Sequence, residues 1–92
     1  MREDLPIEDA AHGAGRWRKA VREHPGSAAA RYALGVALVR ADREDEAEAA
    51  FREAALLRPG WAEAHNALGA TLCRLGRHDE VIDALSVASR LL

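Results

Sequence analysis

The sequence is short of aromatic residues, cysteine and proline. Aromatic residues make up 4% of its 92 residues, three residues are proline, and Cys73 is the single cysteine. One cysteine can form neither an internal disulfide nor, by itself, a zinc site. The composition therefore excludes a disulfide-stapled secreted domain and fits a reducing compartment, which makes the cytoplasm the expected location.

Strong net charge and long apolar runs are also missing. The formal net charge is -2, so no global field attracts nucleic acid. No apolar run approaches the roughly 18 residues that a membrane span needs. Met1–Asp9 carries four acidic residues and one arginine, which is the wrong start for a secretory signal. We expect neither a nucleic-acid nor a membrane partner.

Motifs for metal binding and catalysis are absent as well. The four histidines, His12, His24, His65 and His78, fall in different predicted helices or turns, and no two have the i, i+4 spacing that points two imidazoles at one ion. No glycine-rich phosphate loop follows a predicted strand. We therefore expect no metal, no cofactor and no catalytic residue.

The chain has one basic cluster, which consists of Arg16, Arg18, Lys19 and Arg22 around Trp17. We interpret these residues as a solvated face, near the acidic stretch 42–48, and not as a nucleic-acid site.

What the sequence does have is alanine and leucine. Hydrophobic residues make up 49% of the chain, and these two types supply most of them. Alanine loses no side-chain entropy in a helix and leucine loses little, so this composition predicts an all-α fold.

The sequence repeats itself every 34 residues. Residues 28–58 align with residues 62–92, and 13 of the 31 aligned positions are identical. Going back by the same step aligns Pro25-Gly26 with Pro59-Gly60 and Trp17 with Phe51. Trp17 is therefore expected in the core. The period divides the chain into residues 1–27, 28–61 and 62–92, with the first segment equivalent to the second half of an earlier unit.

Each unit reads as two helices. Small and large apolar residues recur at i, i+3, i+4 and i+7 on both sides of a polar break at Asp42-Arg43, which predicts two amphipathic helices per unit. Proline at position 59 ends the second helix. Gly76 can take a positive φ after the following helix, and Ser27 can cap the helix that begins behind it.

These residues resemble the tetratricopeptide repeat family. Its pattern of Leu-Gly, a large residue, Ala, a large apolar residue, Ala and Pro appears as Leu34-Gly35, Leu38, Ala47, Phe51, Ala54 and Pro59. The resemblance implies antiparallel helix-turn-helix units stacked as a right-handed superhelical solenoid, here about two and a half units with five helices. Arg31 and His65 stand where the family usually has tryptophan, so we expect a looser, more solvated first turn there.

The resemblance also implies a binding surface. In this family the first helix of each unit lines a concave face, where a peptide or a partner helix commonly lies. Carried over by position, that face would consist of Ala29, Tyr32, Val36, Val39, Arg40, Glu63, Asn66, Ala70, Cys73 and Arg74. The alternative is that these ten residues are ordinary solvated side chains with no ligand. Tyr32 and Val36 occupy positions where a carboxylate clamp of the family would need Lys and Asn, so that particular function is not expected.

The last predicted helix differs from its counterpart one unit earlier. Ile82 and Val87 replace Glu48 and Glu53, which makes this helix poorer in charge. We expect a face for self-association or partner docking that consists of Val81, Ile82, Leu85, Val87, Leu91 and Leu92. The alternative is that a further repeat of a longer chain covers it.

The function expected from the sequence is therefore non-catalytic binding of a protein or peptide. Two alternatives stay open. The chain could be a self-association module that forms a homodimer, or it could be an N-terminal repeat region of a larger enzyme such as a transferase.

Overall fold

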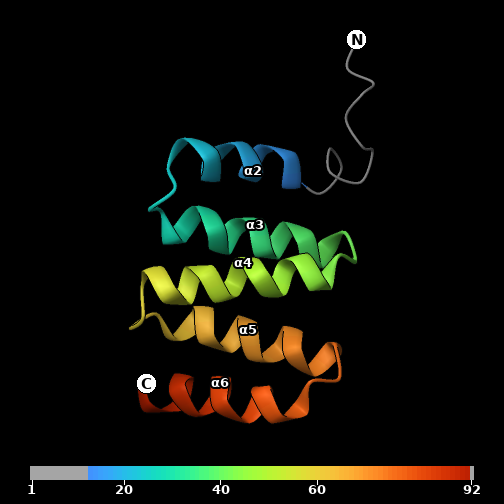
Figure 1. Cartoon of the computed structure of the whole chain (residues 1–92), viewed down its shortest axis with the longest axis vertical. Coiled ribbons are helices and arrows are strands. Elements are labelled where there is room, and N and C mark those ends of the chain that lie inside the picture. Colours follow the sequence, from blue (N-terminus) through green and yellow to red (C-terminus); the bar gives the residue numbers. More distant parts are fainter. Residues whose placement is uncertain (1–12, 92) are drawn as a thin grey trace.

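The computed structural model describes residues 13–91, and these residues are all-α, as predicted. Their helices are α2 (Ala14–Glu23), α3 (Ala28–Arg40), α4 (Glu44–Leu57), α5 (Ala62–Arg74) and α6 (His78–Leu91). Figure 1 shows them as one stack of antiparallel helices, in which each helix lies beside its neighbours in the sequence. His12 and Leu92 lie outside the described residues.

The turns inside the two units have the same geometry. Asp42, after α3, has a φ of 61°, and Gly76, one period later, has a φ of 79°. In both turns the next residue donates its backbone N–H back to the helix, from Arg43 to the Leu38 carbonyl at 2.9 Å and from Arg77 to the Leu72 carbonyl at 2.9 Å. These bonds satisfy carbonyls that a helix end leaves without partners.

The predicted cap at the start of α3 is also confirmed. The Ser27 side chain accepts a hydrogen bond from the Ala30 backbone N–H at 3.1 Å. Such a bond satisfies one of the donors that the first turn of a helix leaves open.

The core alternates small and large side chains. Ala47, Ala54 and Ala64 are fully buried, and the larger side chains of Leu38 and Phe51 fill the space between helices. Trp17 is partly buried and packs against the same core, as its alignment with Phe51 predicts.

Two equivalent glycines let the helices of each unit approach closely. A Cβ built on Gly35 would lie 2.5 Å from the Phe51 ring, and one built on Gly69 would lie 2.8 Å from a Leu85 methyl. Both distances are shorter than real Cβ contacts, so a side chain at either position would have to displace the group opposite it, the Phe51 ring or the Leu85 methyl.

The first turns at Arg31 and His65, which we expected to be looser or more solvated, are held by side-chain contacts, and these contacts are solvent-exposed. The Arg31 guanidinium donates to the Pro25 carbonyl at 3.0 Å, and its other nitrogen forms an ion pair with Glu53 at 2.6 Å. One period later, the His65 Nε2 lies 3.0 Å from the Pro59 carbonyl. Both side chains reach back over the proline turn and bind the backbone that precedes their helix.

An arginine–glutamate ladder connects α2, α4 and α6. Glu46 at the start of α4 accepts hydrogen bonds from Arg43 of its own turn and from Arg18 of α2, both at 2.8 Å. Glu80, one period later, accepts from Arg77 at 2.7 Å and from Arg52 of α4 at 3.2 Å. We call these six residues, Arg18, Arg43, Glu46, Arg52, Arg77 and Glu80, the ladder.

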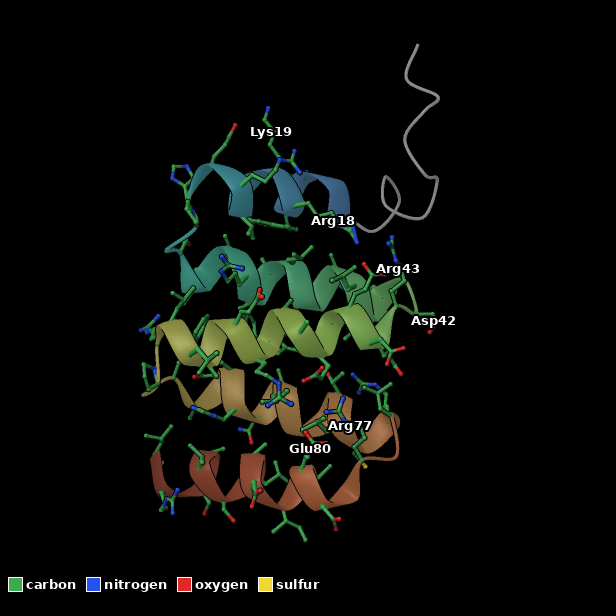
Figure 2. All side chains as sticks on the ribbon, in the orientation of Figure 1. Arg18, Lys19, Asp42, Arg43, Arg77 and Glu80 are labelled. Atoms are coloured by element: carbon green, nitrogen blue, oxygen red, sulfur yellow. The ribbon has the colours of Figure 1, made fainter. Side chains whose placement is uncertain are left out.

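Figure 2 labels Arg18 and Lys19 of the basic cluster, and Arg18, Arg43, Arg77 and Glu80 of the ladder. Lys19 points away from the stack, whereas Arg18 lies on the side of α2 that faces the α3–α4 turn. The predicted approach of the basic cluster to the acidic stretch is therefore confirmed for Arg18, which pairs with Glu46. Arg16 and Arg22 are exposed.

Candidate protein-interaction site

A hollow of about 210 Å³ opens between α3 and α5, with α4 behind it. We call it the α3–α5 hollow. Its lining residues are Tyr32, Val36, Val39, Arg40, Phe51, Ala67, Ala70 and Arg74. Six of the ten residues expected on the concave face are among them, so the structure brings together the main part of the predicted surface.

The walls of the hollow follow from helix geometry. Tyr32, Val36 and Val39 lie at i, i+4 and i+7 on α3, so they share one face of that helix. Across from them α5 contributes the small side chains of Ala67 and Ala70, with Arg74 at one end, which leaves the space open. The wall on α3 is therefore apolar and the opposite wall is thin.

Tyr32 is held in place by two aromatic rings. Its ring centroid lies 5.4 Å from that of Phe51 and 4.8 Å from that of Trp61, with tilted planes in both cases. The Arg58 guanidinium lies over the Trp61 ring, 4.8 Å from its centroid. Tilted rings at such distances attract each other, so the Tyr32 side chain is held in one position before a ligand binds.

Two arginines one period apart lie at the same end of the hollow. The Arg74 Nε donates to Glu44 of α4 at 2.7 Å, so much of its charge is neutralised within the protein. Arg40 is exposed and forms no hydrogen bond or ion pair with any residue that the structure describes. The hollow thus combines an apolar interior with one cation that is available to a partner.

The other four residues of the expected concave face do not line the hollow. Ala29, Glu63, Asn66 and Cys73 are all exposed on α3 and α5. The thiol of Cys73 is free.

Phe51 and Ala67 line the hollow although sequence reasoning did not place them there. The resemblance carries over only positions of the first helix of each unit that point to the concave face. Phe51 belongs to the second helix and was assigned to the core, where its exposure of 2% also places it. The ring of Phe51 lies against Gly35 of α3, a contact that the sequence does not show.

The residues expected to form one association face on α6 do not share a face. Ile82 and Leu85 are exposed together, at 66% and 44%. Val81 instead packs against the core. Val87 lines a second hollow, of about 240 Å³, with Arg52 of α4 and with His65, Leu68, Leu72, Glu80, Asp83 and Ala84. Leu91 is partly exposed at the end of the helix.

Among residues 13–91, no group of three His, Cys, Asp or Glu side chains is placed to hold a metal ion. None of the helices that the structure describes is long and apolar enough to cross a membrane.

A stack of antiparallel helix pairs with a hollow between successive units defines a helical-repeat module of the protein-interaction class. A family model described as tetratricopeptide repeat matches residues 14–71. The chain belongs to the tetratricopeptide repeat family.

Solved structures of MamA are similar to this chain. MamA from AMB-1 superposes with a TM-score of 0.84 at 29% identity, over 94% of this chain and 51% of MamA. MamA from MSR-1 gives a TM-score of 0.82 at 28% identity, over 92% of this chain and 49% of that one. A MamA mutant gives 0.78 at 33% identity, over 83% and 56%. The chain thus spans about half the length of these structures. No curated protein matches the sequence.

Proposed function

We propose that this chain is a non-catalytic scaffold that binds a segment of a partner protein in the α3–α5 hollow. The observation that carries this proposal is an apolar hollow with a fixed aromatic wall and, at its end, the exposed Arg40, which forms no ion pair with any described residue. Small-molecule sites and peptide sites both need apolar walls with a few placed polar groups. The free thiol of Cys73 is exposed, which fits a role in the reducing cytoplasm.

The chemistry of the hollow selects the partner segment. Val36, Val39 and Phe51 offer an apolar surface that a large aliphatic or aromatic side chain would cover. The Arg40 guanidinium would pair with a carboxylate, because its planar fork of N–H donors matches two carboxylate oxygens. We therefore expect a segment in which a large apolar residue stands beside an acidic residue or a terminal carboxylate.

A peptide-display selection tests this proposal. Random twelve-residue peptides are selected on the immobilised chain, and the dissociation constants of the enriched peptides are measured by calorimetry. We expect enrichment of a large apolar residue next to Asp, Glu or a terminal carboxylate.

Two variants then test whether these peptides use the hollow. Ala70→Leu fills the hollow from its exposed side, and Arg40→Glu reverses the available charge; each should weaken binding about tenfold or more, which corresponds to about 1.4 kcal/mol. Arg22→Glu, an equal charge reversal on α2 away from the hollow, is the matched control and should leave binding unchanged. Enriched peptides that bind both hollow variants as tightly as the original chain would contradict the proposal, as would a selection that yields no common pattern.

A further inference from the structure

Three side chains of α4 hold the following unit by ion pairs. The pairs are Glu44 with Arg74 at 2.7 Å, Glu48 with Arg77 at 3.5 Å and Arg52 with Glu80 at 3.2 Å. Since α5 and α6 both take part, this set of charges fixes how the second unit sits on the first. We call the three α4 residues of these ion pairs, Glu44, Glu48 and Arg52, the joining charges.

Helix α6 lacks equivalents of all three joining charges. One period after Glu44, Glu48 and Arg52, the sequence has His78, Ile82 and Ser86. A unit that packed on α6 as the second unit packs on α4 would have no carboxylate and no guanidinium to pair with at these positions. The ion pairs that join α4 to the unit after it therefore cannot form at α6.

The exposed side of α6 forms one continuous stripe. Ile82, Leu85, Ser86 and Ser89 lie at i, i+3, i+4 and i+7, and all four are exposed. We call these four residues the α6 outer face. The two apolar side chains stand beside two small ones, so a helix laid on this stripe could approach closely. None of the residues that line the α3–α5 hollow is on α6.

Charges of both signs lie along one flank of this stripe, at opposite ends. Asp79 and Asp83 lie near the start of α6, and Arg90 lies near its end, eleven residues after Asp79 and so on the same side of the helix. All three are exposed, and none forms an ion pair with another residue that the structure describes.

A second copy of this chain matches these charges. In an antiparallel pair of helices related by a two-fold axis, the same flanks of both helices face each other with their ends reversed. The acidic start of one α6 would then lie beside Arg90 of the second copy, and the same contact would occur twice. A parallel pair brings opposite flanks together and lacks this match. Because the centre of the α6 outer face is apolar, two copies that pair through it bring no like charges together there.

We propose that the α6 outer face is a homodimer interface, in which two copies of α6 pack antiparallel about a two-fold axis near Leu85 and Ser86. The interface consists of an apolar centre, where Ile82 and Leu85 of each copy are covered, and of two peripheral Asp83–Arg90 pairs. It leaves the α3–α5 hollow of each copy open, so the proposal stands independently of the function proposed above. One helix face per copy is a small interface, so the dimer forms reversibly.

Sedimentation equilibrium on the full chain, from micromolar to millimolar concentration, tests the apolar centre. The chain should follow a reversible monomer–dimer equilibrium. Ile82→Glu, at a side chain that is 66% exposed and can change without loss of folding, should raise the dissociation constant at least about tenfold. Leu56→Glu is the matched control, because Leu56 is an apolar side chain of α4 that is 74% exposed and lies outside this face; it should leave the constant unchanged.

The outcomes against the proposal are distinct. A monomer up to the millimolar range would overturn it, and so would an open assembly larger than a dimer. A dimer that Ile82→Glu does not weaken would place the contact elsewhere. Circular dichroism of both variants shows whether each has kept its helices.

A charge-swap cycle tests the antiparallel arrangement. Asp83→Arg and Arg90→Asp should each weaken the dimer, because each places like charges opposite each other. The double variant restores opposite charges and should return the dissociation constant to within about threefold of the original. A double variant as weak as the sum of the two single variants would rule out the antiparallel pairing.

Discussion

At the scale of single residues, the same glycine has two different surroundings in the two units. Gly35 faces the Phe51 ring, which is 2% exposed and held between α3 and the next unit. Gly69 faces Leu85, which is 44% exposed because α6 packs on one side only among the described helices. The sequence shows two equivalent Leu-Gly pairs, yet only one of the two opposing side chains is free to move.

This difference gives the first stability prediction. Gly35→Ala should lower the free energy of unfolding by about 1–2 kcal/mol, since the new methyl collides with a ring that cannot move and this cost exceeds the gain in helix propensity of roughly 1 kcal/mol. Gly69→Ala should leave the stability unchanged or raise it by up to about 1 kcal/mol, because Leu85 can turn toward solvent. Urea unfolding of both variants, at a concentration where the chain is monomeric, measures the two changes. Equal losses at both positions would contradict this account.

Residue identity alone could not sort the apolar residues of the last helix. Val81, Ile82, Leu85 and Val87 are similar in type, and the sequence places all of them on one charge-poor helix. Their roles depend on angle about the helix axis relative to α5, which a list of residues does not contain. The structure divides them among the core, the α6 outer face and the second hollow.

At the scale of helices, the ladder ties each second helix to the next one across the intervening first helix. The Arg43 hydrogen bond, followed by the charge of the same arginine and of Arg18, lowers the pKa of Glu46. The Arg77 hydrogen bond, with the charge of the same arginine and the contact of Arg52, lowers the pKa of Glu80. Both carboxylates thus hold protons less tightly in the folded chain than in the unfolded one.

The sign of the pH dependence follows from these lowered pKa values. Because the folded pKa lies below the unfolded one, the ladder stabilises the fold above the ordinary glutamate pKa of about 4.5, and this contribution is lost as the pH falls through the folded values. The Glu46→Gln, Glu80→Gln double variant should therefore lose stability at pH 7 and lose less than the original chain between pH 5 and pH 3. Thermal unfolding across this range measures the effect, and added salt should reduce it.

Glu63→Gln is the matched control, because Glu63 is an exposed glutamate of α5 outside the ladder. It should change neither the stability at pH 7 nor its slope. A double variant whose pH profile runs parallel to that of the original chain would contradict the role given to the ladder.

The helices themselves were predictable, and their polar contacts were not. The 34-residue period, the proline turns and the cap at Ser27 place the five described helices. Asp42 and Gly76 are equivalent positions of the two units, which explains why the two turns have the same geometry. The contacts of the ladder between helices were out of reach because Arg18 and Glu46, like Arg52 and Glu80, are 28 residues apart and meet only when the units stack. The contact of Arg31 with the Pro25 carbonyl is only six residues long in sequence, and it was missed because it depends on the conformation of the proline turn.

At the scale of the whole molecule, the helices form a chain of pairwise contacts. Each helix packs on the helices before and after it in the sequence, and the stack has the proportions of a slab, 48 × 27 × 15 Å. In Figure 1, α2 and α6 are the outermost described helices, and each has a neighbour on one side only. Stability in such a stack is approximately a sum of units and of the interfaces between them.

This arrangement predicts graded protection from hydrogen exchange. In monomeric conditions the amides of α3, α4 and α5 should exchange slowest, because each of these helices has packed neighbours on both sides, and those of α6 and α2 should exchange faster. Native-state exchange followed by NMR measures the gradient. Uniform protection from α2 to α6 would show that the chain unfolds only as a whole and that the pairwise description is inadequate.

The central claim is that the α3–α5 hollow receives the partner segment, and its most direct test is an NMR titration. The labelled chain is titrated with the peptide most enriched in the display selection, and the shift changes of all assigned amides are mapped. We predict that the largest changes fall on Tyr32, Val36, Arg40 and Ala70. Shift changes confined to α2, to the ladder or to the α6 outer face, with these four amides unmoved, would contradict the claim.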